Sequence, residues 1–518
     1  MAEPSRERSL SSETIGNSLR TAIATAINAL TSAASTIIIV RALGPAIYGR
    51  YTFFGILIAL VLGLSDLGFN SRGLSVLVRA EALGDMAAVV VEIRRLLIIG
   101  LCRAIVIGAT AAVVFHNEPV AGLLVGLGIM LQALCAGLSI SLVARRRYRI
   151  LTASSVAFSL TQSIATSWVA ITTHDPALTV GAFFASQLVT AAVAAVFAPW
   201  RLITHARRKV QPRQSRPEFR TILAFYISVT CQIIIFGQSE TIILHYDHQA
   251  IALGFFAIAT TLSARATLLT DALYGALLPS LGSASIRDSD GITRAYSAAL
   301  RFSSLLVLLT TALLGPVAVV IGPIVLGSHA GSVRVATVIT LGASLLQTFV
   351  YPLAYVAAVE TQRAAIAIPA LLGALFDAGL SILLIPHYGL FGAAAASLVG
   401  GLAFGLSVSL MTRIPPGAKM ALRSQLIRVL VMIAVLVISG IATEHAGVGV
   451  ALGVMWISVL SVYMACRFGH GVLTTTDIDR VRAAEHHWPI TLSARTWRVA
   501  VLLLLVTTHA SIAHGTDA

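Results

Sequence analysis

The chain has 518 residues, of which 57% are apolar and only 11% are charged, and its mean hydropathy is +0.88. Soluble domains carry roughly 25% charged residues, so this composition excludes a water-soluble globular protein. Many segments of 18 or more residues carry few or no charges, and each is long enough to cross a bilayer as a helix. The alternating apolar and polar pattern of a membrane β-barrel is absent from the sequence. The sequence therefore predicts an all-α polytopic membrane protein.

Taken in chain order, the apolar segments predict about 14 transmembrane helices. The polar N-terminus lacks a small-residue cleavage site and does not read as a signal peptide. Near the C-terminus, the uncharged segment 499–513 is short for a span, so we assign it to an interfacial or buried position. The predicted spans are residues 20–40, 51–69, 96–115, 120–144, 150–172, 178–200, 221–244, 252–274, 302–327, 335–359, 364–386, 390–412, 429–443 and 449–466.

The net charge of +14 follows membrane topology rather than nucleic-acid binding. With the N-terminus inside, 31 of the 36 Lys and Arg residues fall in predicted cytoplasmic segments. Only Arg41, Arg50 and Arg334 fall on the other side, while Arg103 and Arg265 lie within spans. This asymmetry is the positive-inside rule. We therefore expect a bacterial inner-membrane protein with both termini in the cytoplasm, surrounded by membrane lipids and without a nucleic-acid partner.

A basic connection and an internal repeat predict the domain organisation. Residues 201–220 carry seven basic residues and two prolines, and they separate two sets of six helices. An offset of 205 residues places Gly49 on Gly254 and Asp66 on Asp271. We predict an N-lobe, a basic cytoplasmic linker, a C-lobe, a further helix pair and a cytoplasmic or interfacial tail, with the bounds 1–200, 201–220, 221–412, 413–470 and 471–518.

Ionisable residues inside the spans are the candidate functional residues, because an unpaired charge within a bilayer costs several kcal/mol and usually faces a watery cavity. Asp377 lies at the best depth to be a partner of Arg265. The alternative interpretation is that these residues form structural ion pairs between helices. The predicted substrate-binding residues are Arg265, Asp377 and Arg103, and the predicted coupling or gating residues are Asp66, Asp271 and Glu240.

Signatures of enzymes, metals and cofactors are weak. The four cysteines lie in predicted spans without the spacing of a disulfide framework or a metal site. Asp288-Ser289-Asp290 and Asp477-Ile478-Asp479 match an Asp-x-Asp pattern of glycosyltransferases, but both lie in solvated cytoplasmic segments. His245 to His248 occupies a minimal connection between helices. We therefore predict no catalytic residue, no metal, no cofactor and no enzymatic activity.

Several short motifs follow one another along the predicted spans. They are Arg41-Ala42-Leu43-Gly44-Pro45, Tyr48-Gly49, Asp66-Leu67-Gly68, Ala252-Leu253-Gly254-Phe255-Phe256 and Ile385-Pro386-His387-Tyr388-Gly389-Leu390-Phe391-Gly392-Ala393-Ala394. In this order on a chain with 14 spans, they resemble the Wzx-type polysaccharide flippases of the multidrug/oligosaccharidyl-lipid/polysaccharide exporter superfamily. The resemblance covers nearly the whole chain.

The resemblance implies two pseudo-symmetric six-helix lobes in a MATE-like V around a polar cavity, with a C-terminal helix pair and alternating access. It implies export of oligosaccharide repeat units linked to polyprenyl pyrophosphate, for surface or exopolysaccharide synthesis. Polymerase and export machinery are the implied partners. Only Arg265 matches the cavity arginines of related flippases of lipid-linked precursors, so it is the implied pyrophosphate ligand.

Two other classes of protein remain as alternatives. A cation or drug antiporter of the same superfamily would be expected to stop at twelve helices and to favour acidic cavity residues. A membrane enzyme of polysaccharide assembly, such as a polymerase or ligase, would be expected to need large exported loops. The exported connections here are only a few residues long. The glycan and the coupling ion are not identified by the sequence.

Overall fold

The computed structural model describes the greater part of the predicted membrane region. Every regular element among the described residues is helical, in agreement with the predicted all-α class. The predicted spans 302–327 and 449–466 and the tail 471–518 lie outside the described residues, so the total number of spans and the domain bounds stay predictions. The structure describes residues 24–25, 27–66, 85–144, 148–197, 219–235, 239–264, 330–359, 362–413 and 429–438, together with isolated positions between 69 and 83 and between 422 and 427.

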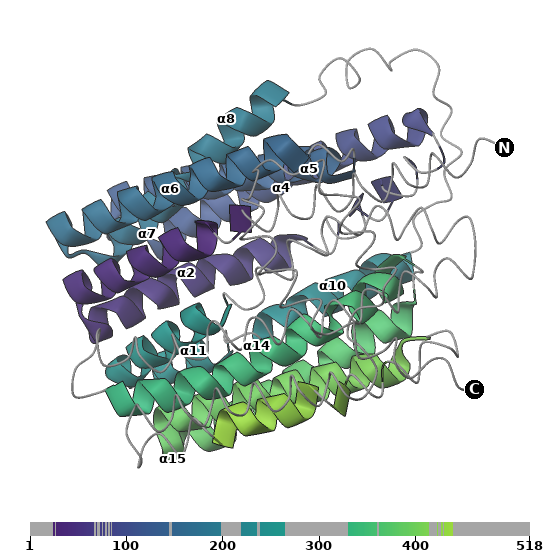
Figure 1. Ribbon diagram of the computed structural model, residues 1–518. Helices are drawn as coiled ribbons and strands as arrows, with labels where there is room; N and C mark the ends of the chain where they lie inside the picture. The colour runs from purple at the N-terminus through teal and green to yellow at the C-terminus, as the bar shows by residue number, and fades with distance from the viewer. Residues whose placement is uncertain are drawn as a thin grey trace, which may run out of the picture.

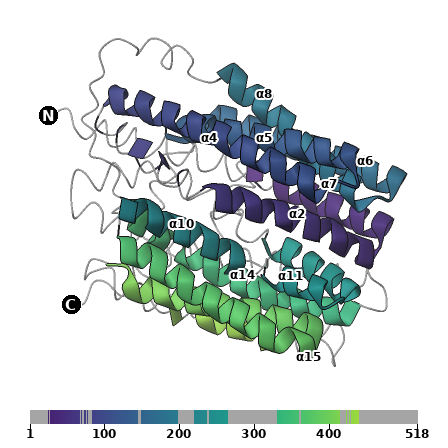
Figure 2. The ribbon, with the colours of Figure 1, turned by 180° about the vertical axis from the view of Figure 1, so that it is seen from behind.

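The described helices form two bundles that lie side by side (Figures 1 and 2). The first bundle contains a helix over residues 27–43, α2 (Pro45–Asp66), α4 (Met86–Val114), α5 (Pro119–Ala144), α6 (Tyr148–Thr173), α7 (Pro176–Ala185) and α8 (Gln187–Phe197). The second contains α10 (Phe219–Ile233), α11 (Ser239–Tyr246), a helix over Ala250–Ala264, α14 (Ala330–Val359), α15 (Arg363–Met411) and a helix over Val429–Ile438. Helix α2 is the part of the first bundle that contacts α10 and α11.

The outer surface of these helices is apolar, as lipid contact requires. Leu123 and Val113 on the first bundle and Leu410 on the second are among the most exposed apolar side chains. Five of the described helices are long and apolar enough to cross a membrane. Each bundle also has its own apolar interior, built around Ile107, Val125 and Ile129 in the first and Leu345, Phe349 and Phe404 in the second. The protein is therefore a multi-pass membrane protein.

Helix α15 is a hairpin of two helices rather than one continuous helix. Gly389 has φ 51° and ψ −120°, which interrupts the helix at the boundary that the sequence predicts between spans 364–386 and 390–412. A residue with positive φ favours glycine, because a side chain there would be strained. The two arms fold back on each other so closely that a Cβ on Gly400 would lie 2.5 Å from the Cβ of Asp377. Asp377 is thereby held against the other arm.

The seventh predicted span, residues 221–244, is divided into two helices. Helix α10 ends at Ile233 and is followed by a π-helical turn at residues 234–235, and α11 begins at Ser239. The continuous apolar run of the sequence predicted one helix here. Divided helices of this kind are common where transporters bind substrates or ions.

The two bundles meet at the end of the molecule where the sequence places its exported connections. A Cβ on Gly49 would lie 3.0 Å from the backbone nitrogen of Gly254. A Cβ on Gly254 would lie 1.9 Å from the carbonyl oxygen of Pro45, so only glycine allows this approach. His174, which follows α6, contacts the carbonyl oxygen of Ala42 through Nδ1 at 2.9 Å. Predicted exported connections therefore gather at one closed end.

Candidate functional site

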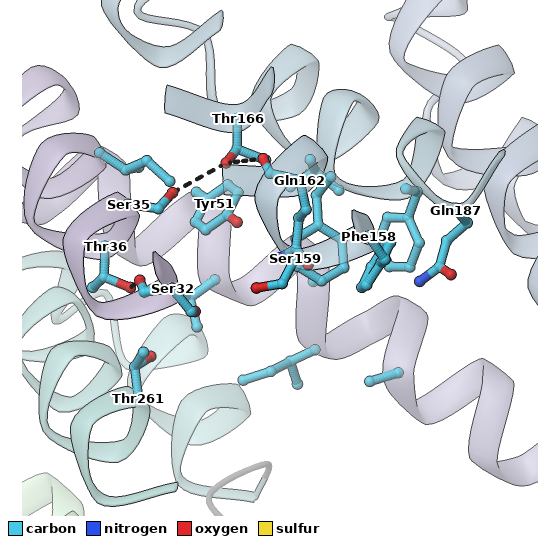
Figure 3. Close-up of a pocket in the computed structure, with 18 of the residues that line it drawn as sticks. Ser32, Ser35, Thr36, Tyr51, Phe158, Ser159, Gln162, Thr166, Gln187 and Thr261 are labelled. Atoms are coloured by element: carbon cyan, nitrogen blue, oxygen red, sulfur yellow. Dashed lines mark hydrogen bonds between the residues drawn. The ribbon is translucent and has the colours of Figure 1, made fainter. Parts of the chain in front are cut away.

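A cavity of about 560 Å³, lined by both polar and apolar side chains, opens beside the first bundle, and Figure 3 shows side chains around it. Its size lies within the range of roughly 300–1,000 Å³ that ligand pockets occupy. Most of the lining comes from the helix of residues 27–43, α2, α6 and α7, and Thr261 is contributed by the second bundle. The polar side chains of the described lining are all uncharged: Asn28, Ser32, Ser35, Thr36, Tyr48, Tyr51, Thr52, Gln132, Ser155, Ser159, Gln162, Thr166, Gln187 and Thr261.

A ladder of hydrogen bonds between the helix of residues 27–43 and α6 forms one wall. Its rungs are Asn28 Nδ2 to Ser155 Oγ at 2.6 Å, Thr31 Oγ1 to Ser159 Oγ at 2.8 Å, and Ser35 Oγ to Thr166 Oγ1 at 3.2 Å. The rungs advance together along both helices, so the two helices run parallel. Spacings of three, four or seven residues place successive rungs on one helix face. The ladder therefore follows the length of the cavity.

Aromatic and amide side chains complete the lining. Figure 3 shows Tyr51, Phe158, Ser159, Gln162 and Gln187 among the side chains that line the cavity. Hydroxyl and amide groups both donate and accept hydrogen bonds, and aromatic faces offer flat apolar surfaces. A sugar ring presents hydroxyl groups around its edge and carbon–hydrogen faces above and below. The cavity thus has the chemistry that an uncharged sugar needs.

A second polar cluster lies inside the second bundle, at the start of α11. The hydroxyl of Ser239 donates a hydrogen bond to Asp377 Oδ2 at 2.6 Å and contacts Glu240 Oε2 at 3.1 Å. Both carboxyl side chains have no exposed surface. The remaining oxygens, Glu240 Oε1 and Asp377 Oδ1, lack a hydrogen-bond partner in the part of the chain that the structure describes. Two carboxyls this close stay buried most easily when they share a proton.

The third cluster is a buried ion pair within the first bundle. Arg103 Nη1 lies 2.7 Å from Asp66 Oδ1, and Nη2 donates to the carbonyl oxygen of Leu62 at 3.0 Å. The Nε of Arg103 also donates to Ser65 Oγ at 3.4 Å. Arg103 therefore ties α4 to the last turn of α2. This arrangement corresponds to the structural ion pair that the sequence left open as the alternative to a binding or gating role.

The structure thus joins four of the six predicted site residues into two pairs, Asp66 with Arg103 and Glu240 with Asp377. Arg265 and Asp271 lie outside the described residues, so their roles stay predictions. The cavity residues were missed by the analysis of charged side chains. Their signal was present as polar residues spaced three or four apart within two apolar spans: Asn28, Thr31, Ser32 and Ser35 in one and Ser155, Ser159, Gln162 and Thr166 in the other. Within the described residues, no group of three or more His, Cys, Asp or Glu side chains could hold a metal ion.

Comparison with known protein families identifies the family of this chain. The family described as "Polysaccharide biosynthesis protein" matches residues 38–331, which is more than half of the chain. The protein belongs to this family. The match covers α2 to α11 and most of the cavity, and it confirms the resemblance to Wzx-type proteins. No curated protein matches the chain.

Solved structures with the same fold are transporters. An outward-facing multidrug resistance MATE family transporter of the MOP superfamily is 14% identical with a TM-score of 0.59, over 81% of this chain and 96% of that chain. A mutant of the Vibrio cholerae MATE transporter VcmN is also 14% identical, with a TM-score of 0.60 over 80% of this chain and 98% of that chain. At this identity the likeness shows the fold alone, and it confirms the predicted MATE-like class. Family and fold together point to a transporter rather than an enzyme.

Proposed function

We propose that the protein is a flippase that moves oligosaccharide repeat units, linked to polyprenyl pyrophosphate, across the bacterial inner membrane by alternating access. The product would serve synthesis of a surface polysaccharide or exopolysaccharide. The observation that carries this proposal is the cavity with uncharged hydroxyl, amide and aromatic lining in a member of a polysaccharide biosynthesis family. Sugar hydroxyl groups cannot enter hydrocarbon without losing hydrogen bonds to water, so they need such partners during transfer. The lipid tail can stay in the bilayer.

The other two clusters and Arg265 receive roles in the same cycle. Arg265 would bind the pyrophosphate, because a guanidinium group is always charged and forms paired hydrogen bonds with phosphate oxygens. The Glu240–Asp377 pair would supply coupling, because a buried acid pair changes charge when it exchanges a proton. The positive-inside asymmetry of the sequence supports cytoplasmic termini, so the closed end would face the periplasm.

The central test is export of the cognate glycan in a strain that lacks its own flippase. Gln162→Leu removes an amide from the cavity and should lower the export rate about tenfold, because one lost hydrogen bond costs about 1 kcal/mol and neighbouring groups lose their partner as well. Arg265→Ala should abolish export, while Arg265→Lys should retain part of it.

The matched control is Ile164→Leu on the same helix, since Ile164 is an exposed apolar residue on the lipid side. All variants are compared at equal amounts of protein in the membrane. If Gln162→Leu and Arg265→Ala both export glycan at the wild-type rate, neither the cavity nor the arginine acts in glycan transfer.

The buried acid pair favours one second candidate, a cation-coupled exporter of small cationic compounds. Acidic residues inside the helices are the feature that this class would need. The same strains distinguish the two proposals. A drug exporter would lower the accumulation of cationic dyes and would leave glycan export unrestored.

A further inference from the structure

Helix α11 is a short helix that makes contacts of different kinds at its two ends. It spans only Ser239–Tyr246, eight residues, which corresponds to a rod about 12 Å long. Its first residues lie in the buried acid cluster of the second bundle, against α15. Its last residues contact α2 of the first bundle. No other described helix this short joins the acid cluster to the opposite bundle.

The attachment at the start of α11 depends on charge. The single hydroxyl hydrogen of Ser239 can be donated to only one carboxyl oxygen at a time, although Asp377 Oδ2 and Glu240 Oε2 both lie within reach. When both carboxyls are ionised they repel each other, and burial makes this repulsion strong because little water screens it. When one carboxyl is protonated, the pair can share that proton. A change in the charge of the pair would therefore act on the spacing between α11 and α15.

The attachment at the end of α11 is a ring stack. The rings of His245 and Phe53 are parallel to within 10°, with centroids 3.7 Å apart. Leu244 and Phe53 are both buried in the apolar cluster that joins the two bundles. The charged or titratable groups that act on His245 in the described structure are Arg50 and His248. A shift of α11 would therefore move the ring of His245 relative to Phe53 and act directly on α2.

The α-helical hydrogen bonding is interrupted after α10, and the far end of α11 lies near the contact between the bundles. The π-helical turn at residues 234–235 lies between α10 and α11, and such turns interrupt the regular hydrogen bonding of an α-helix. The ring stack lies one turn along α2 from Gly49, the residue that packs against Gly254 where the bundles meet. Movement of α11 would thus act close to the contact that closes this end of the molecule.

We propose that α11 transmits the charge state of the Glu240–Asp377 pair to the contact between the bundles, with His245 and Phe53 as the positioning residues at that contact. Protonation of one carboxyl draws α11 against α15 and keeps this end closed. Ionisation of both carboxyls pushes α11 away and loosens the stack on Phe53. The inference rests on the proposed function insofar as a transporter must open this end during its cycle.

A double-mutant cycle on the full-length protein tests the link. Nitroxide labels are placed at Thr173 and Ile251, exposed residues of the first and second bundle at the closed end, after replacement of the four native cysteines. Pulsed electron paramagnetic resonance then gives the ratio of closed to open molecules. Glu240→Gln mimics the protonated carboxyl and should raise this ratio at least about fivefold, the low end of typical coupling between sites. In the Phe53→Ala background the same substitution should change the ratio by less than about twofold.

A second cycle uses the partner of each residue: Asp377→Asn replaces Glu240→Gln, and His245→Ala replaces Phe53→Ala. If one variant misfolds, the other cycle still tests the link. Ile164→Leu, on the exposed apolar face of α6, is the control and should leave the effect of Glu240→Gln unchanged. Equal effects of Glu240→Gln with and without Phe53 would overturn the inference, and so would the absence of any effect in the wild-type background.

The cycle needs no glycan, so its outcome is separate from that of the export assay. If the effects of the two substitutions are additive and the protein exports glycan, α11 has no transmitting role but the proposed function is supported. If the effects are coupled and the protein exports no glycan, the proposed substrate is wrong but the role of α11 is supported.

Discussion

At the scale of single residues, the structure shows which buried ionisable side chains are partners. The sequence identified these side chains but not their partners. Asp66, Arg103, Glu240 and Asp377 were recognisable because each is an ionisable residue in an apolar segment. Their partners were not, because a partner depends on how separate helices pack. The ladder residues gave a weaker signal, since Ser and Thr in a helix commonly bond a carbonyl of the preceding turn, as Thr166 does with Gln162 at 2.7 Å.

The Asp66–Arg103 pair gives a prediction at this scale. Arg103→Ala leaves a buried carboxylate without its cation, and loss of one member of such a pair costs about 3 kcal/mol of stability. The midpoint of thermal unfolding in detergent should fall clearly, and addition of Asp66→Asn should restore most of the loss. Arg149→Ala is the control, because Arg149 is an exposed arginine at the start of α6. Its cost should be below about 1 kcal/mol. An Arg103→Ala protein with normal stability and no export would instead support the predicted substrate-binding role.

At the scale of elements, hydropathy predicted most described helices with bounds close to those observed. The boundary between spans 364–386 and 390–412 was found because Pro386 and Gly389 mark a turn. The sequence did not predict the division of span 221–244, because a continuous apolar segment predicts one helix whether or not the helical backbone is interrupted. The sequence also did not show which glycines let the two arms of α15 pack closely. A glycine that packs against a neighbouring helix and a glycine that faces lipid cannot be distinguished from the sequence.

Two glycines of α15 provide the matching test. Gly400→Ala places a Cβ 2.5 Å from the Cβ of Asp377 and should separate the arms of the hairpin, with loss of stability of about 1–3 kcal/mol. Gly379→Ala meets no atom within 4 Å, and alanine is the better helix former, so this variant should be as stable as the wild type or slightly more stable. Thermal unfolding of both variants in the same detergent checks the contrast. Equal stability of the two variants would mean that the arms do not pack as described.

At the scale of the whole molecule, the sequence predicted a repeat and the structure adds a contact. Gly49 and Gly254, which the offset of 205 residues relates, lie against each other where the bundles meet. Residues that correspond in two repeats touch each other only near the axis that relates the repeats. The closure of this end could not be predicted, because nothing in the sequence states which conformation of a transporter is populated.

Gly254→Ala should hold this end open, because its Cβ would overlap the carbonyl oxygen of Pro45 in the backbone of α2. The labels at Thr173 and Ile251 should then report longer distances than in the wild type, and export should be lost while the protein remains folded. Gly379→Ala again serves as the control and should leave the distances unchanged. Wild-type distances in Gly254→Ala would show that the bundles can close without this glycine contact.

The ladder between the helix of residues 27–43 and α6 also bears on the step in which a transporter without substrate returns to its starting conformation. Groups that wait for a ligand usually hold water, and removing that water slows any step that must pass through a dry state. Here Asn28, Thr31 and Ser35 form hydrogen bonds with α6, so these wall groups keep partners within the protein when the water leaves. Drying this wall should therefore cost little, and we expect the rate of transfer to be set by the half of the cycle in which substrate is bound.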